Sequence, residues 1–174
     1  MIDLEQDHLP TSLVVGGEEW PVRTSFRVWL RFVRILQKHH VCDPSIFEGE
    51  VPPGEWAEAA GEFARSECPT PHGGERAGRV FDILMDSDYL VAAFQQAYGI
   101  DLCEGDMHWH RFLALWRGLP SDTRLSEIVG HRSWRRSRRS PESVHEELRD
   151  RWSLPEEQDE ELLRLQQSWF GGGE

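Results

Sequence analysis

The residues best suited to binding a metal form two groups along the chain: His39, His40 and Cys42 in the first, Cys68 and His72 in the second. Imidazole and thiolate groups of this kind can hold zinc in a tetrahedron. The spacing lacks the closely spaced cysteine pair of structural zinc modules, and both groups fall where loops are expected. We therefore expect no metal site and no other cofactor.

Two further polar clusters could support chemistry. Asp82, Asp86 and Asp88 could supply oxygen ligands to a divalent cation. Acidic residues are also typical of the start of a helix, where they suit the macrodipole, and we interpret the three aspartates in that way. His108 and His110 are two residues apart, so they point to different faces of a helix and are interpreted as ordinary helix residues.

Several classes of enzyme are excluded by what the sequence lacks. Lys38 is the only lysine, which rules out a phosphate-binding GxxxxGK[ST] loop. There is no GxSxG motif, no HExxH motif and no cysteine–histidine signature. The three cysteines are irregularly spaced and suggest free thiols rather than a disulfide framework. We expect no catalytic residue and no enzymatic activity.

The segment between Trp20 and Cys42 contains basic residues and no acid. Its basic members recur at i, i+4, i+7 and i+11 and therefore form one row on a helix: Arg27, Arg31, Arg34 and Lys38. From residue 43 to residue 106 the balance reverses, with 14 acids against three bases. Segregated charge of this kind favours charge-complementary contacts, so the row is a candidate partner-binding surface.

A second basic block, Arg132–Arg139, is the candidate for binding nucleic acid, because Trp134 could stack on a base beside the arginines. The arginines that follow this tryptophan are Arg135, Arg136, Arg138 and Arg139. Nine acids occur between Glu142 and Glu161, and the formal net charge of the chain is −12. Both facts argue against a phosphate partner. We favour pairing of these blocks within the chain or between subunits.

The chain has 174 residues, which suits one domain or one domain with a tail. Apolar residues make up 39% and include eight tryptophans, enough for a core. No uncharged apolar run approaches the roughly 20 residues of a membrane span. The acidic opening MIDLEQDH does not resemble a secretory signal. We expect a protein without membrane contact, located in the cytoplasm.

A β-hairpin is predicted near the N-terminus, with Gly16-Gly17 as its turn. This places Leu13 opposite Trp20 and Val15 opposite Glu18. The apolar residues that then share one face of the hairpin are Leu13, Val15, Trp20 and Val22. A helix capped by Thr24 or Ser25 should follow as far as Lys38. Its predicted apolar face is Phe26, Trp29, Leu30, Val33 and Leu36.

The other elements are predicted to be helices. Pro53 should open one that buries Trp56, Ala60, Phe63 and Ala64. Asp86 or Ser87 should cap the next, which buries Leu90, Ala93, Phe94 and Ala97 and ends at Gly99. Asp106 should cap the central helix Met107–Arg117. A short helix should follow around Leu125, Ile128 and Val129.

Two helices are predicted after the arginine cluster. The first opens at Ser140-Pro141-Glu142 and buries Val144, Leu148 and Trp152; the second follows Pro155, with Leu162, Leu165 and Trp169 at helical spacing. The sequence thus predicts a mainly α protein: a helical domain with a short N-terminal β-hairpin over residues 1–154, and a C-terminal helical arm with a Gly-rich tail over residues 155–174.

Several stretches resemble one family. They are Leu9-Pro-Thr-Ser, Trp20-Pro-Val, the run from Phe81 to Leu102, the run from Asp106 to Leu119, and Leu125-Ser-Glu-Ile-Val-Gly-His-Arg. Together they are similar to the siphophage "gene product fifteen" family, encoded beside the tape-measure protein. His110 and His131 stand where relatives usually have an aromatic residue. Both differences are compatible with a helical core.

The resemblance implies a role like that of a tail-assembly chaperone, which binds the tape-measure protein and tail-tube proteins in the cytoplasm of the host bacterium and leaves before the virion is complete. A possible homo-oligomer, a permanent minor tail component and a nucleic-acid-binding regulator using Arg132–Arg139 remain alternatives. Trp29, Trp109 and Trp116 are expected in the core. The surface candidates are Trp56, Trp134, Trp152 and Trp169. The expected partner-binding set is Arg27, Arg31, Arg34, Lys38, Trp134, Arg135, Arg136, Arg138, Arg139, Trp152, Leu162, Leu165 and Trp169.

Overall fold

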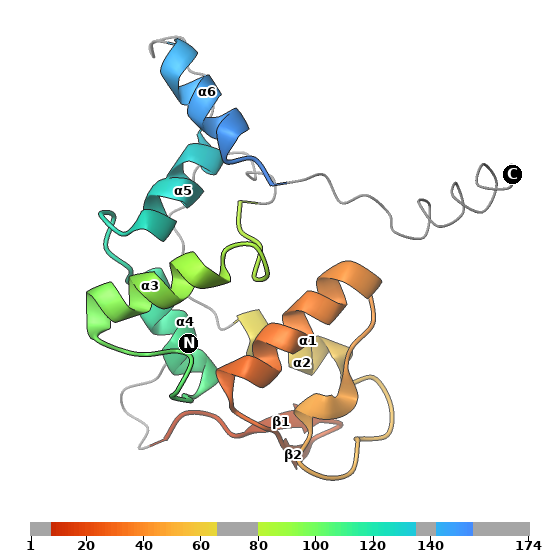
Figure 1. The fold of residues 1–174 in the computed structure, drawn as a ribbon. Coiled ribbons are helices and arrows are strands. Elements are labelled where there is room, and N and C mark those ends of the chain that lie inside the picture. Colours follow the sequence, from red (N-terminus) through yellow and green to blue (C-terminus); the bar gives the residue numbers. More distant parts are fainter. Residues whose placement is uncertain (1–7, 66–79, 135–141, 155–174) are drawn as a thin grey trace, which may run out of the picture. The chain divides into compact units, whose positions relative to one another are not determined.

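The computed structural model describes residues 8–65, 80–134 and 142–154. These contain six α-helices, a short 3-10 helix and one two-stranded sheet (Figure 1). The protein is therefore mainly α with an N-terminal β-hairpin, as predicted. The boundary expected at residue 154 stays a prediction, because residues 155–174 lie outside the described part.

The chain divides into two compact units. The first comprises Met1–Glu75 and Ile83–Glu127, and the second comprises Arg76–Asp82 and Ile128–Glu174. The first unit holds the hairpin and the helices α1 to α4, whereas the second holds α6. Helix α5 (Arg124–Ser133) passes from one unit into the other.

The hairpin has the predicted register. Strands β1 (Ser12–Val15) and β2 (Glu18–Pro21) pair antiparallel, with Leu13 opposite Trp20. The glycines of the turn have φ angles of +63° and +86°, which residues with a Cβ rarely adopt. Leu13 is buried and Val14 is 61% exposed, so the two faces of the strand differ as alternation requires.

Helix α1 (Phe26–His39) begins where predicted but is not capped as predicted. Ser25 occupies the cap position and makes no side-chain cap hydrogen bond. Its hydroxyl instead donates to Asp106 Oδ1 at 2.9 Å. The first backbone N–H of the helix, that of Phe26, donates to the carbonyl of Met107 at 2.9 Å. A segment about 80 residues away in the sequence thus replaces the local cap.

The buried face of α1 consists of Phe26, Trp29 and Phe32. The prediction missed Phe32, which has no exposed surface. Three residues predicted on this face are only half-buried: Leu30, Val33 and Leu36. The interior side of the helix is therefore rotated from the predicted one. Besides helix α4 (Trp109–Arg117), the helix contacts the 3-10 helix η1 (Pro44–Ile46).

Helix α2 (Ala57–Arg65) starts later than predicted. Pro53 lies outside it, because Gly54 has a φ of +98° and interrupts the helical backbone. Ala60 and Phe63 are buried as predicted, whereas Trp56 and Ala64 are half-buried.

Helix α3 (Ser87–Tyr98) agrees with the prediction at both ends. Asp86 is at its N-cap position, and Gly99 closes it in the left-handed conformation with φ +66°. The side chain of Asp86 makes no cap hydrogen bond and is buried, so it does not act as an exposed charge at the start of the helix. The residues of the buried face are Leu90, Ala93 and Phe94, while Ala97 is half-buried.

Helix α4 (Trp109–Arg117) has a cap that differs from the predicted one. It starts two residues later than expected, and its N-cap is His108 rather than Asp106. His108 Nδ1 accepts from the backbone N–H of His110 at 3.1 Å. The carboxylate of Asp106 instead accepts from the hydroxyl of Ser25 and from the backbone N–H of Met107, which precedes the helix.

The core of the first unit centres on Phe112, which has no exposed surface. Phe26, Phe94 and Trp109 stack with it at ring-centroid distances of 4.9, 5.3 and 5.7 Å. Trp116 contacts it edge-on at 5.5 Å. Helix α4 is therefore central, as predicted, although Trp116 is half-buried.

Helix α4 also completes the C-terminus of α2. The last carbonyls of a helix lack intrahelical partners. Three α4 side chains meet this need: His110 Nε2 at 3.0 Å from Phe63 O, Trp109 Nε1 donating to Ala64 O at 3.1 Å, and Arg117 donating to Arg65 O at 2.8 Å. Aromatic packing and hydrogen bonds to backbone carbonyls thus both connect α4 to the C-terminal end of α2.

In the second unit, helix α6 (Glu142–Arg151) is present as predicted. Leu148 and Trp152 are half-buried, but Val144 is 62% exposed and was wrongly assigned to the buried face. Of the short-helix residues predicted in α5, Leu125 and Ile128 are buried, and Val129 is half-buried.

Candidate interaction surfaces

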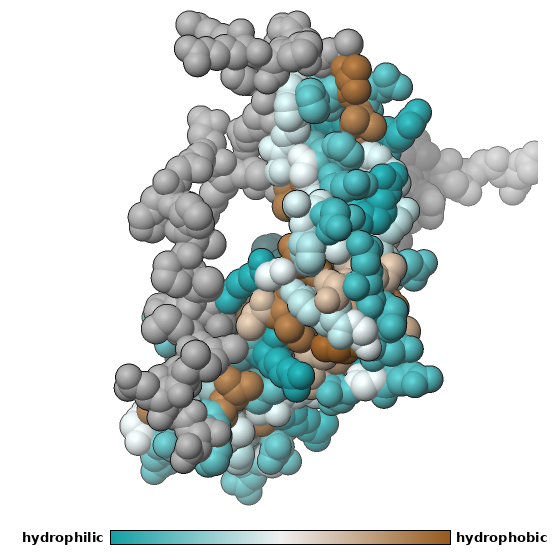
Figure 2. All heavy atoms as spheres, turned by 90° about the vertical axis from the view of Figure 1, so that its left-hand side faces the viewer, coloured by the Kyte–Doolittle hydropathy of each residue, from teal (hydrophilic) through white to brown (hydrophobic). Residues whose placement is uncertain are grey.

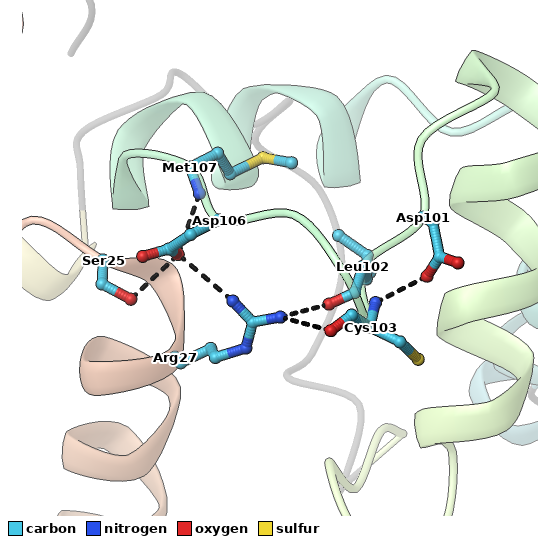
Figure 3. A network of polar contacts seen from close by, with 7 residues as sticks. All are labelled: Ser25, Arg27, Asp101, Leu102, Cys103, Asp106 and Met107. Atoms are coloured by element: carbon cyan, nitrogen blue, oxygen red, sulfur yellow. Dashed lines mark hydrogen bonds and ion pairs between the residues drawn. The ribbon is translucent and has the colours of Figure 1, made fainter.

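The four basic residues predicted as one row on α1 do not share one environment. Arg27 is fastened to the loop between α3 and α4 (Figure 3): it donates to Leu102 O at 2.7 Å and to Cys103 O at 3.1 Å. It also lies 3.6 Å from Asp106 Oδ1 and over the ring of Phe26. Arg27 therefore stabilises the fold of the first unit.

Asp106 is the centre of this network (Figure 3). Besides the hydroxyl of Ser25, it accepts from the backbone N–H of Met107 at 2.9 Å. The segments entering α1 and α4 run side by side there, since Ser25 and His108 form an isolated antiparallel bridge. A carboxylate beside two helix starts is favourable, because each helix presents the positive end of its dipole.

The rest of the row faces solvent. Arg31, Arg34 and Lys38 are exposed, and Arg31 has 64% of its side chain accessible. Arg31 Nε lies 3.5 Å from Asp43 Oδ2. The backbone hydrogen bond from Ser45, together with Arg31, holds the pKa of Asp43 below its usual value despite its burial. These three bases form the part of the row that can meet a partner, and we call them the basic row.

In the second unit, the candidates Arg132, Trp134 and Trp152 take part in the internal structure. Arg132 Nε donates to Trp152 O at 2.6 Å, and its Nη1 donates to Val80 O at 3.2 Å. Trp134 stacks on His145 with ring centroids 5.3 Å apart. Both tryptophans are half-buried. Arg132 is thus engaged by backbone carbonyls, which argues against its use for phosphate.

The remaining predicted partner-binding residues lie outside the described residues. They are Arg135, Arg136, Arg138, Arg139, Leu162, Leu165 and Trp169. Cys68, His72 and the expected surface residue Trp169 fall in the same category. The candidate Trp56 is half-buried, with Phe47 edge-on at 5.2 Å.

Large apolar side chains are exposed at positions that the sequence analysis did not single out. Leu84 is 67% exposed and Met85 is 54% exposed, and both lie in the turn before α3. Figure 2 shows one face of the molecule on which apolar side chains appear as patches among hydrophilic ones. The sequence signal was an apolar pair, Leu84-Met85, placed just outside the periodicity of the following helix.

His108 and His110 are not the ordinary helix residues that we expected. Their ring centroids lie 5.3 Å apart, and His110 packs on Phe63 at 4.4 Å. His108 Nδ1 accepts a hydrogen bond, so Nε2 must carry the proton that is donated to Pro10 O at 2.9 Å. His110 is buried, and its Nδ1 has no hydrogen-bond partner. Both rings therefore fit their sites in the neutral form.

These contacts predict a loss of stability in acid. Burial lowers the pKa of His108 and of His110 below the ordinary value of about 6.5. The hydrogen bonds to the carbonyls of Pro10 and Phe63 raise these pKa values, but by less. The nearby charge of Arg117 lowers the pKa of His110 further. Below about pH 6.5 the unfolded chain then binds more protons than the folded one, so the free energy of unfolding decreases as the pH is lowered.

The measurement is urea unfolding between pH 5 and 7.5. The double variant H108N/H110Q keeps a cap acceptor and a donor toward Phe63 but cannot titrate, so its stability should depend less on pH than that of the wild type. Equal pH dependence in the two proteins would show that these histidines do not control acid stability.

The described residues contain no group of three or more histidine, cysteine or acidic residues placed to hold a metal ion. Cys42 and Cys103 are free thiols. No helix within the described ranges is long and apolar enough to cross a membrane.

Comparison with protein families gives a match. A family described as "Bacteriophage Gp15 protein" matches residues 55–153, which is more than half of the chain. The chain belongs to the bacteriophage Gp15 protein family. It is therefore a bacteriophage protein, and the resemblance noted in the sequence is confirmed. The matched segment begins just before α2 and includes Leu84, Met85, Arg132, Trp134 and Trp152, whereas α1 precedes it. Comparison with curated proteins and with solved structures gives no match.

Proposed function

We propose that this Gp15 family protein acts like a tail-assembly chaperone of a phage with a long non-contractile tail. It binds the tape-measure protein and tail-tube subunits in the cytoplasm of the host bacterium during tail morphogenesis. Its action is binding alone, without enzymatic chemistry. The family membership supplies the phage context, and the exposed side chains supply the means of contact.

The observation that carries this proposal is the exposed apolar pair Leu84 and Met85, within the segment matched by the family. A tape-measure protein is a long, largely helical chain whose apolar stripes need cover. Leucine and methionine are suited to such a client, because methionine in particular adapts its shape to different apolar surfaces. The net charge of −12 would keep the complex soluble.

Of the alternatives, a permanent minor tail component would use the same surfaces and differ only in remaining in the virion. A nucleic-acid-binding regulator is less well supported, because Arg132 is engaged by the carbonyls of Trp152 and Val80.

The test is co-expression of the full chain with the tape-measure protein of the same phage. We expect more soluble tape-measure protein, co-purifying with the chain. The variant L84S/M85S should reduce the co-purified amount at least about tenfold, because burying each apolar side chain contributes about 1.5–3 kcal/mol and 1.4 kcal/mol is a factor of ten.

Val14 provides a matched control, since it is 61% exposed and lies on β1. V14S should behave like the wild type. A tape-measure protein that is equally soluble with and without the chain would refute the proposal.

A further inference from the structure

Helix α6 has an apolar stripe formed by Val144, Leu148 and Trp152, at i, i+4 and i+8. Trp152 directly follows the helix, and its backbone N–H still donates to Leu148 O at 3.1 Å, so the helical turn extends to it. Leu148 and Trp152 are half-buried, whereas Val144 is 62% exposed. The stripe is therefore covered least at its N-terminal end.

The end of α5 packs on a different side of α6. His145 stacks on Trp134 with ring centroids 5.3 Å apart, and Arg132 Nε donates to Trp152 O at 2.6 Å. Successive residues of a helix point about 100° apart, so Val144 lies to one side of the stacked His145. The apolar sector of α6 is thus wider than the part that these contacts within the second unit cover.

The chain supplies a matching apolar surface directly after α6. Pro155 is suited to the first turn of a helix, and Leu162, Leu165 and Trp169 follow it at i, i+3 and i+7. Residues 152–155 separate this pattern from α6. A connection of that length is typical of two antiparallel helices that pack side by side, because such hairpins have loops of about two to five residues.

We propose that residues 156–170, here called the C-terminal segment, form a helix that folds back antiparallel on α6 and covers its apolar stripe. At a rise of about 1.5 Å per residue, Val144 lies about 10 Å before the end of α6, and Leu162 lies about 9 Å after the start of the C-terminal segment. The two side chains therefore meet at the same level, and Leu165 follows one turn beyond.

The occupant of the stripe is the chain's own segment rather than a second copy or a client. The short connection holds the C-terminal segment at an effective concentration in the mM range, whereas two copies with a net charge of −12 each repel one another. The contact requires no partner and does not depend on the proposed function. In the free protein, Trp152 and the apolar residues of the C-terminal segment then cover one another and are closed to partners.

The test is amide hydrogen–deuterium exchange of the full chain, followed in α6 with α1 as the internal reference. In L162S/L165S/W169S the amides of α6 should exchange at least about tenfold faster than in the wild type, because α6 opens more readily without its cover, while α1 exchanges as before. V144S changes the other side of the contact and should also accelerate exchange in α6.

The matched control is E160S/R164S/Q167S, which alters the opposite side of the C-terminal segment and should exchange like the wild type. Equal exchange in α6 for the control and for L162S/L165S/W169S would overturn the proposal. So would faster exchange in α1 as well, which would indicate general unfolding. Protection of α6 that disappears on tenfold dilution would assign the stripe to a second copy instead. Because no client is present, these outcomes are independent of tape-measure binding.

Discussion

Replacing Phe112 by alanine is expected to lower the free energy of unfolding by about 3–5 kcal/mol. Phe112 has no exposed surface and contacts the rings of Phe26, Phe94, Trp109 and Trp116. Truncation therefore removes the transfer free energy of one ring and leaves a cavity among four others. Since single domains are commonly stable by only about 5–15 kcal/mol, the variant should be close to unfolding.

The measurement is urea unfolding followed by tryptophan fluorescence at neutral pH. Arg111 is the adjacent, exposed position on α4 and provides the control: R111A should stay within about 0.5 kcal/mol of the wild type. Similar stabilities for F112A and R111A would mean that the aromatic stack is not the core of the first unit.

Replacing Arg27 by methionine is expected to cost about 1.5–3 kcal/mol, the range for hydrogen bonds to a charged group. The change removes the donors to Leu102 O and Cys103 O and the ion pair with Asp106. Leu102 is buried, so its carbonyl would have to find another partner at a cost.

The matched change is R34M, because Arg34 is an exposed arginine on the same helix. It should alter stability by no more than about 0.5 kcal/mol. The measurement is the denaturant midpoint of each variant. Equal midpoints would show that the stability of the loop between α3 and α4 does not depend on Arg27.

The local part of the fold could be predicted from the sequence, because local rules determine it. Gly16-Gly17 and the alternation around it specify the hairpin register, and Gly99 ends α3. The cap of α4 could not be predicted in this way. Asp106 has the right chemistry for a cap, but Ser25 and Arg27 from a distant segment compete for its carboxylate, and His108 takes the cap position instead.

The same distinction applies to the surfaces. Spacing alone placed Arg31, Arg34 and Lys38 together, since it depends only on helical geometry. It could not separate Arg27 from them, because the carbonyls that bind Arg27 come from a loop about 75 residues later in the chain. The exposure of Leu84 and Met85 could not be predicted from the sequence either, because it depends on which residues pack on the turn before α3.

We propose that this phage protein acts by transient binding to tail proteins. Quantitative mass spectrometry of tail assembly intermediates from infected cells and of purified virions tests it most directly. We expect the chain to accompany the tape-measure protein in the intermediates and to be absent from the virion. A fixed number of copies in purified virions, or no association with the tape-measure protein in the intermediates, would contradict it.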